Sequence, residues 1–192
     1  DEIIIFHVET TGLSPTHDRL TEIGAVRMRG MQVVETFNTM VDPEQPIPAK
    51  IVELTGITDA MVEGAPKEAE AQRKFMEFCG ENPVLAAHNA KFDTSFVRNV
   101  CKRQHITFDF ATLDTLILCK CMLPTMSRHR LDGVAKALKL GKFDHHRASD
   151  DAQMLAKIYK ELVSRLIQTK GAVLLSRSEE HTSELQSHLN LV

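Results

Sequence analysis

A run of β-branched and aromatic residues near the start of the chain most constrains the fold, because it leads directly into polar residues. The segment IIIF at 3–6 continues as HVETTG, which places His7 and Glu9 two positions apart. Alternate residues of a strand point to the same face of a sheet. We therefore predict a buried strand over residues 3–8 that ends at a functional site and carries His7 and Glu9 on one face.

Apolar patterns along the rest of the chain predict an α/β domain with a mixed sheet and helices on its faces. Two β-rich segments, 20–30 and 31–41, meet at Arg29-Gly30 and indicate a hairpin. A proline-rich loop is expected at 42–50, and Thr58-Asp59 is expected to begin a helix. The remaining predicted elements are helices at 66–80, 90–103, 129–140 and 150–167, a strand at 83–89, and a strand that turns into a helix over 110–123. The resulting order is βββ-α-β-α-β-α-α.

Composition restricts the classes of protein to which the chain can belong. The chain has 192 residues, 43% hydrophobic and 26% charged, which suits one globular domain. It contains no apolar run long enough to span a membrane. The net charge of −3 gives no overall basic character, so nucleic acid would have to be bound through local patches and metal ions. The first residue is Asp1 rather than methionine, and we expect a fragment or a processed chain.

The four cysteines do not form a recognisable metal-binding or disulfide pattern. Cys119-Lys-Cys121 has poor spacing for zinc, and Cys79 and Cys101 stand alone. We predict buried free thiols.

The last residues differ in character from the helix before them. The segment SRSEEHTSELQSHLNLV, from 176, has no apolar periodicity and resembles the translation of a DNA-sequencing adapter. We therefore predict a domain over 1–170 and exclude 177–192, with His181 and His188, from the fold. The natural chain is expected to continue beyond this point.

Three short segments carry carboxylates where a strand ends or a helix begins. They are the strand end with Glu9, the segment AHNAKFDTSF with Asp93, and the segment HHRASDDA with His146 and Asp151. Carboxylates collected in this way suit divalent cations with oxygen ligands, especially magnesium. Two such ions about 4 Å apart can activate water for phosphodiester hydrolysis, and a nearby histidine can accept its proton.

Each of these residues also has an ordinary structural interpretation. An aspartate at a helix start is commonly an N-cap, and Ser149 or Asp150 could cap the last predicted helix. Single histidines such as His105, His129 and His145 are commonly surface residues or hydrogen-bonded in the core.

Taken together, the three segments resemble the motifs of the DnaQ-like exonucleases of the DEDDh type. The first motif, Asp-x-Glu-Thr-Thr-Gly, corresponds to HVETTG at 7–12. The second, His-Asn-x-x-Phe-Asp, corresponds to HNAKFD at 88–93, and the third, His-x-Ala-x-x-Asp, to HRASDD at 146–151. ELTGIT at 53–58 and HRLDGVAKAL at 129–138 resemble the proofreading domain of PolC-type DNA polymerase III in particular. The resemblance covers about residues 2–166.

The resemblance implies a ribonuclease-H-like fold with three antiparallel strands followed by parallel additions. It implies 3′→5′ hydrolysis of DNA with release of nucleoside monophosphates, and two divalent ions, Mg²⁺ or Mn²⁺. Glu9, Asp93 and Asp151 would be metal ligands, and His146 the general base. A single-stranded DNA 3′ end and the polymerase part of the same chain would be its partners, in a monomeric domain without a membrane anchor in the bacterial cytoplasm.

The resemblance also implies residues that contact the substrate. The backbone around Thr10 to Leu13 would line the terminal nucleotide, and the 54–57 loop would pack against its base or serve as a structural turn. Phe92 and Phe96 are better interpreted as core residues, although an aromatic ring near the site could stack on a base. Lys120, Arg128, Arg130 and Lys136 would contact phosphates or simply be solvated. The substrate-binding set predicted in this way is Thr10, Thr11, Gly12, Leu13, Leu54, Asn89 and Phe92.

His7 stands where the family has its first aspartate, a residue that bridges both metal ions. A neutral imidazole offers one nitrogen lone pair and no negative charge, so we predict weak binding of the second metal and severely reduced magnesium-dependent activity. Manganese accepts nitrogen more readily and is expected to recover part of the activity. Three interpretations stay open: a sequencing error, an inactivating change, or an active variant with altered metal preference.

Two further functions remain beside the proofreading exonuclease. One is a stand-alone or helicase-fused DnaQ-like nuclease that acts on DNA or RNA. The other is a module that binds a 3′ end without cutting it, which His7 supports and the presence of Glu9, Asp93, His146 and Asp151 disfavours.

Overall fold

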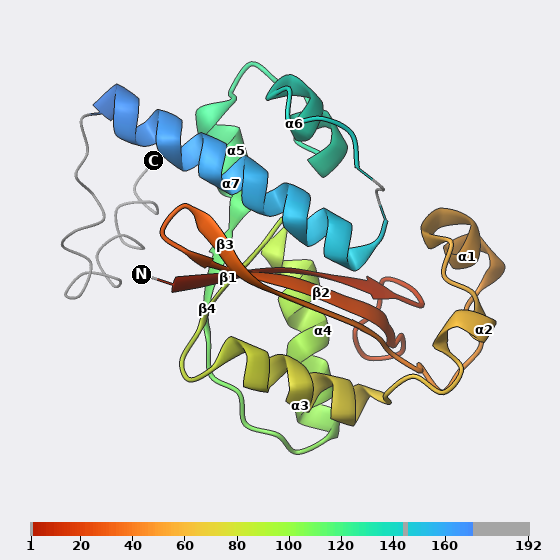
Figure 1. Ribbon diagram of the computed structural model, residues 1–192. Helices are drawn as coiled ribbons and strands as arrows, with labels where there is room; N and C mark the ends of the chain where they lie inside the picture. Colours follow the sequence, from red (N-terminus) through yellow and green to blue (C-terminus); the bar gives the residue numbers. More distant parts are fainter. Residues whose placement is uncertain (1, 144–145, 171–192) are drawn as a thin grey trace.

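The computed structural model describes residues 2–143 and 146–170, and a five-stranded sheet forms its centre (Figure 1). The strands are β1 Glu2–Thr10, β2 Leu20–Arg29, β3 Gln32–Met40, β4 Val84–Ala87 and β5 Ala111–Asp114. They lie in the order β3-β2-β1-β4-β5. Antiparallel pairing joins β1 to β2 and β2 to β3, whereas β4 runs parallel to β1 and β5 parallel to β4. The predicted mixed sheet, with three antiparallel strands followed by parallel ones, is confirmed.

The predicted hairpin joins β2 to β3 at Gly30. Its φ angle of 59° lies in the left-handed region, which glycine adopts without a steric penalty. The observed helices are α1 Ala49–Thr55, α2 Asp59–Val62, α3 Glu68–Cys79, α4 Ala90–Arg103, α5 Thr115–Met122, α6 Leu131–Ala137 and α7 Ala148–Lys170.

Helices cover both faces of the sheet and create two hydrophobic cores. On one face, Phe6 and Val8 of β1 pack with Phe75 of α3 and Phe96 of α4. On the other face, Ile5, which directly precedes Phe6, packs with residues of α5, α6 and the long helix α7. Figure 1 shows α3 on one side of the sheet and α7 on the other. The period-two alternation along β1 therefore divides its side chains between the two cores.

The region between β3 and α3 differs from the prediction. Residues 49–55, which overlap the predicted loops at 42–50 and 54–57, form the short helix α1, so Leu54 lies on a helix and is 54% exposed. Ile51 and Val52 of α1 pack with Ile47, Ile57 and Val62 in a small separate core. Thr58-Asp59 does begin a helix, but that helix has only four residues.

Two smaller predictions are also corrected. Helix α7 begins at Ala148, so Ser149 and Asp150 lie inside its first turn and neither is its N-cap. Cys79, Cys101 and Cys119 are buried free thiols as predicted, but Cys121 is exposed. His145 and the excluded tail 177–192 lie outside the described residues. Among the described helices, none is long and apolar enough to cross a membrane.

Candidate active site

The site begins on the face of β1 that α7 covers. His7 and Glu9 point to this face, in line with Ile5 of the second core. Their neighbours on the antiparallel strand β2 are Gly24, opposite His7, and Glu22, opposite Glu9. The predicted strand does end at a cluster of polar groups, and its polar face continues onto the adjacent strand.

Asp93 joins the cluster from the first turn of α4. Because β4 lies parallel to β1, the helix that follows β4 begins next to the end of β1. Asp93 is 1% exposed, and its Oδ1 accepts hydrogen bonds from the His7 ring at Nδ1, 2.9 Å away, and from the backbone N–H of Val8, 3.1 Å away. This carboxylate is therefore held against β1 by two hydrogen bonds.

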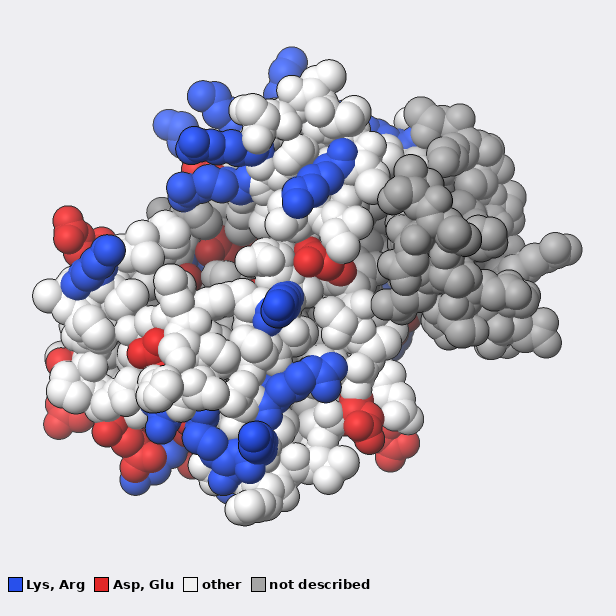
Figure 2. Space-filling model, turned by 180° about the vertical axis from the view of Figure 1, so that it is seen from behind, with Lys and Arg blue, Asp and Glu red and all other residues white. Residues whose placement is uncertain are grey.

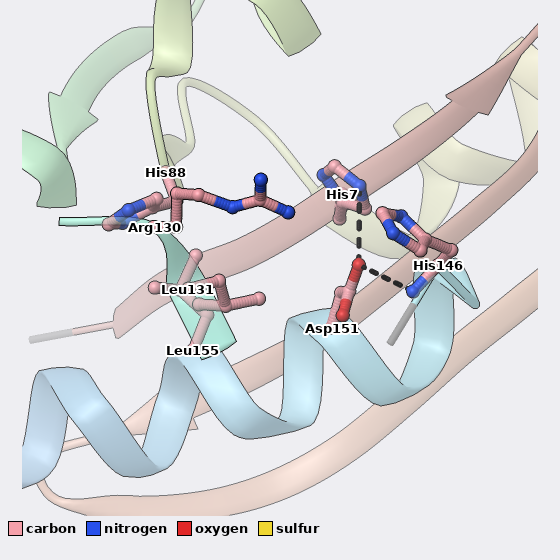
Figure 3. Close-up of a pocket in the computed structure, with 7 residues that line it drawn as sticks. All are labelled: His7, His88, Arg130, Leu131, His146, Asp151 and Leu155. Atoms are coloured by element: carbon pink, nitrogen blue, oxygen red, sulfur yellow. Dashed lines mark hydrogen bonds and ion pairs between the residues drawn. The ribbon is translucent and has the colours of Figure 1, made fainter. Parts of the chain in front are cut away.

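Asp151 and His146 approach from the start of α7 (Figure 3). Asp151 is 1% exposed, and its Oδ2 lies 3.5 Å from His7 Nε2. The same oxygen accepts a hydrogen bond from the backbone N–H of His146 at 3.3 Å. His146 has a φ of 74°, in the left-handed region that non-glycine residues seldom adopt. The structure thus brings together His7, Glu9, Asp93, Asp151 and His146 from three distant segments.

The imidazole of His7 lies among three carboxylates. Its Nε2 is 3.5 Å from both Glu9 Oε1 and Asp151 Oδ2, and its Nδ1 is 2.9 Å from Asp93 Oδ1. Burial lowers the pKa of His7, but the interactions with Asp93 and then Glu9 outweigh it and hold that pKa well above its ordinary value. The three carboxylates therefore favour the protonated ring, whose positive charge offsets part of theirs.

The donor set fits a cation. One ligand atom from each of His7, Glu9 and Asp151 lies within 4.8 Å of the others. In the described part of the chain, Glu9 Oε1 and Asp93 Oδ2 are buried without a hydrogen-bond partner. Buried carboxylate oxygens are costly unless they are paired or coordinate a metal. These two oxygens are therefore suited to divalent metal ions, whereas His7 can supply a nitrogen ligand only in its neutral form.

A cavity of about 250 Å³ opens beside this cluster. It is lined by His7, His88, Arg130, Leu131, His146, Asp151 and Leu155 (Figure 3). The guanidinium of Arg130 points toward His7 in this view. Figure 2 shows further basic side chains around α6, and the exposed ones in this segment are Arg128, Arg130, Lys136, Lys139 and Lys142. Positive charge thus lies next to an acidic site.

His88 fixes one wall of the cavity. Its ring contacts Thr115 Oγ1 at 3.2 Å through Nδ1 and the backbone carbonyl of His129 at 2.5 Å through Nε2. Burial lowers the pKa of His88, which favours the neutral ring that donates to the carbonyl. The segment that presents Arg130 is thereby tied to the end of β4.

The residues after β1 form a closely bonded turn. Thr10 Oγ1 donates to the Gly12 carbonyl at 2.6 Å, and Thr11 Oγ1 accepts from the backbone of Arg19 and from Gln45. Both threonines are buried, whereas Leu13 is 82% exposed. The threonine side chains thus stabilise the turn, and Leu13 is free to contact a ligand.

The other predicted substrate contacts are more dispersed. Leu54 is exposed on α1, and Asn89 is exposed at the start of α4 with a φ of 66°. Phe92 is half-buried, 5.1 Å from Phe96 between ring centroids, and it packs against the first core. This packing supports the interpretation of Phe92 as a core residue.

Two residues that support the site, Glu22 and Arg147, were not predicted from the sequence. Glu22 is fully buried on β2 and accepts hydrogen bonds from the side chain of Arg147. A charged residue within the apolar segment LTEIGAV was the available signal, since a buried carboxylate requires a partner.

Comparison with known proteins identifies the family. The model of the exonuclease family matches residues 4–159. The chain is 44% identical over 160 residues to a PolC-type DNA polymerase III of Clostridium perfringens, which covers 83% of this chain and 11% of that protein. It is 37% identical over 172 residues to the Bacillus subtilis protein of the same name, covering 86% of this chain and 12% of that protein. The chain therefore spans about one eighth of the length of these relatives.

Solved structures of exonucleases share the fold. Exonuclease I superimposes with a TM-score of 0.76 at 21% identity, covering 88% of this chain and 43% of that one. Exonuclease X in complex with 5′ overhanging duplex DNA gives a TM-score of 0.68 at 23% identity, covering 88% of this chain and 93% of that one. The predicted ribonuclease-H-like fold and the predicted class of phosphodiester hydrolase are confirmed, and 3′→5′ exonuclease function is supported. The exonuclease family depends on divalent metal ions, which the cluster of His7, Glu9 and Asp151 could hold, and this chain belongs to that family.

Proposed function

We propose that this chain is a metal-dependent exonuclease that degrades single-stranded DNA from its 3′ end and releases nucleoside monophosphates. The observation that carries the proposal is the convergence of three buried carboxylates, two of whose oxygens lack a hydrogen-bond partner, beside a cavity that Arg130 lines. Such a site can hold cations on one side and a phosphate on the other.

Each site residue has a distinct role in this proposal. Glu9, Asp93 and Asp151 hold two divalent cations, Mg²⁺ or Mn²⁺. When bound, such ions activate water and stabilise the leaving oxygen of a phosphodiester. His146 lines the cavity on the Asp151 side and takes the proton from the attacking water.

His7 lowers the activity of this arrangement with magnesium. The imidazolium adds a positive charge where cations have to bind, and even the neutral ring offers only one nitrogen lone pair. Magnesium prefers oxygen ligands in strict octahedral geometry, whereas manganese accepts nitrogen more readily. We therefore propose a strongly impaired enzyme that recovers part of its activity with manganese.

The terminal nucleotide binds at the end of β1. The backbone from Thr10 to Leu13 lines it, and the exposed side chains of Leu13 and Leu54 supply apolar surface for its base. Asn89 lies at the start of α4, close in sequence to Asp93. One solved relative in fold is Escherichia coli exonuclease I in complex with a dT13 oligonucleotide, which supports a single-stranded substrate.

A second function is favoured by the ion pairs of His7. With an imidazolium already among the carboxylates, the domain would bind a 3′ end without cutting it. In either case the domain is proposed to be monomeric, to occupy residues 1–170, and to work beside the polymerase part of a larger bacterial chain in the cytoplasm. The similarity to PolC-type polymerases supports this setting over a stand-alone or helicase-fused nuclease.

The test is digestion of a 5′-labelled single-stranded DNA, resolved on a gel, by the chain with His7 and by His7→Asp. We expect His7→Asp with magnesium to produce a 3′→5′ ladder more than about tenfold faster than the chain with His7. With manganese, the difference in digestion rate between the two proteins should be smaller. The double variant His7→Asp/Asp93→Asn is the control, and it should lose the ladder if the activity belongs to this site.

Two outcomes would contradict the proposal in different ways. Equal digestion by both proteins in magnesium would show that His7 is a tolerated ligand and that the argument about metal charge is wrong. No digestion by either protein in either metal would reject the exonuclease proposal for this chain. A gel-shift with the same DNA would then decide whether it binds 3′ ends.

A further inference from the structure

The start of α7 is held on the sheet by an ion pair with a buried carboxylate, outside the cluster of proposed metal ligands. Glu22 of β2 is 0% exposed, and both of its oxygens accept from the guanidinium of Arg147, each at 3.2 Å. Its Oε2 also accepts from the backbone N–H of Ala148 at 3.0 Å. Ala148 is the first residue of α7, and its N–H has no partner within the helix. Glu22 therefore caps α7 from a neighbouring strand.

A carboxylate at the position of Glu22 is unfavourable unless its contacts with Arg147 and Ala148 compensate for the cost. Glu22 lies directly opposite Glu9 on the neighbouring strand, and like charges in such a pair repel each other. A buried carboxylate also loses its hydration, so it needs a partner of opposite charge. Arg147 supplies that charge with two hydrogen bonds, and the N-terminal end of the helix dipole adds to it.

A close backbone contact between β2 and α7 also restricts where the helix can lie. A Cβ atom built on Gly24 would lie 2.2 Å from the Ala148 carbonyl carbon and 2.3 Å from the Ser149 nitrogen. The first turn of α7 thus rests directly on the backbone of β2. Gly24 is the cross-strand neighbour of His7, so this contact lies next to the acidic cluster.

The segment held in this way carries two residues of the proposed active site. His146 directly precedes Arg147, and the backbone N–H of Asp151 donates to the Arg147 carbonyl at 2.9 Å. We propose that the Glu22–Arg147 pair is a positioning device that sets His146 and Asp151 against Glu9 and Asp93. The inference rests on the proposed function for its catalytic consequence, but the placement of the helix can be tested without activity.

The first test uses the chain with His7 and the conservative variant Arg147→Lys. Lysine keeps the charge but cannot form the two parallel hydrogen bonds to one carboxylate. We expect backbone amide exchange in residues 148–152 to become about tenfold faster, while exchange in the second half of α7 is unchanged. Calorimetric titration with Mn²⁺ should show affinity reduced by about 10- to 100-fold, because Asp151 is no longer held in place.

The second test measures activity in the His7→Asp background. Arg147→Lys and Glu22→Gln should each lower kcat by about 10- to 100-fold with little change in KM for DNA. Arg165→Lys is the matched control, because Arg165 lies on the same helix and forms an exposed pair with Glu161. That variant should change neither kcat nor Mn²⁺ affinity.

The outcomes separate this inference from the proposed function. Unchanged amide exchange and Mn²⁺ affinity in Arg147→Lys would overturn the positioning role. Faster exchange with unchanged Mn²⁺ affinity and unchanged kcat would also overturn it, because the pair would then only stabilise the helix. If His7→Asp has no activity at all, the proposed function fails. The amide exchange and the Mn²⁺ affinity of Arg147→Lys then still decide whether the Glu22–Arg147 pair has a positioning role.

Discussion

The charge of His7 determines how the acidic cluster is stabilised when no metal is bound. Three carboxylates within reach of one another repel, and burial adds the cost of lost hydration. An imidazolium at 2.9 Å from Asp93 and 3.5 Å from Glu9 and Asp151 offsets part of that cost. The histidine that we propose weakens metal binding therefore also makes the cluster less dependent on metal for its stability.

Thiol reactivity gives a prediction at the residue scale. Burial raises the pKa of Cys79 to about 12 and that of Cys119 to about 11, and it also raises the pKa of Cys101. At pH 8, which is below these values, the three thiols stay protonated, and the thiolate is the reactive form. Cys121 is exposed. We expect a disulfide reagent at pH 8 to titrate one thiol rapidly and the other three only after denaturation.

The substitution Cys121→Ser provides the control for this measurement. It should abolish the rapid phase and leave three thiols that react in denaturant. Rapid reaction of two or more thiols in the folded protein would mean that one of the buried cysteines is accessible.

Residue-scale prediction from the sequence was limited by distance along the chain. The motif residues Glu9, Asp93 and Asp151 could be named because they lie within recognisable local patterns. The partner of Glu22 could not, because Arg147 is 125 positions away and only the packing of α7 on β2 brings them together. The ion pairs of His7 likewise depend on the tertiary placement of Asp93 and Asp151.

At the scale of elements, a second ion pair with a buried carboxylate joins α3 to α4 and supports the turn after β1. Glu68 is 6% exposed and accepts two hydrogen bonds from Arg103, at 2.9 and 2.7 Å, and one from the backbone of Leu20. Arg103 also donates to the carbonyl of Pro15. Replacement of Arg103 would remove both side-chain hydrogen bonds to this buried carboxylate and leave as its counter-charge only the more distant Arg19, whose Nε lies 3.7 Å from Glu68 Oε2.

We expect Arg103→Ala to lower the free energy of unfolding by about 3 kcal/mol. Lys74→Ala is the control, because Lys74 pairs with Glu70 on the surface of α3 and should contribute no more than about 0.5 kcal/mol. Urea denaturation of both variants measures the loss in the free energy of unfolding that each substitution causes. Equal losses in the two variants would show that the Glu68–Arg103 pair adds no more stability than an exposed pair.

Long elements were predicted better than short ones for a physical reason. Helix α4 was expected at 90–103 and is observed at Ala90–Arg103, because fourteen residues give several turns of apolar periodicity. Helix α1 has only seven residues, follows a proline-rich loop, and has no side-chain N-cap hydrogen bond. Its stability comes from packing with Ile57 and Val62, which a local pattern cannot reveal.

At the scale of the whole molecule, the strand order explains why one site gathers three distant segments. The central strand β1 has β2 on one side and β4 on the other, so Glu22 and the start of α4 both flank its end. Helix α7 then crosses the same face and completes the cluster with Asp151. The element order predicted a mixed sheet, but the crossing of α7 over β2 depends on the close backbone contact at Gly24.

The extent of the folded domain gives the last prediction. The second core includes Ile158 and Leu162 of α7, both 0% exposed, and Val163 is also buried at 8%. We expect a chain of residues 1–170 to unfold within about 2 °C of the 192-residue chain, since every residue of the two cores is kept. Thermal denaturation followed by circular dichroism measures this directly.

A chain that ends at Ala156 serves as the contrasting control. It lacks Ile158 and Leu162, and loss of each large buried side chain costs about 2–5 kcal/mol, against a total stability of about 5–15 kcal/mol for a typical domain. We therefore expect this shorter chain not to fold cooperatively. If the 1–170 chain instead melts many degrees below the full chain, residues 171–192 contribute to packing, and the exclusion of 177–192 from the fold is wrong.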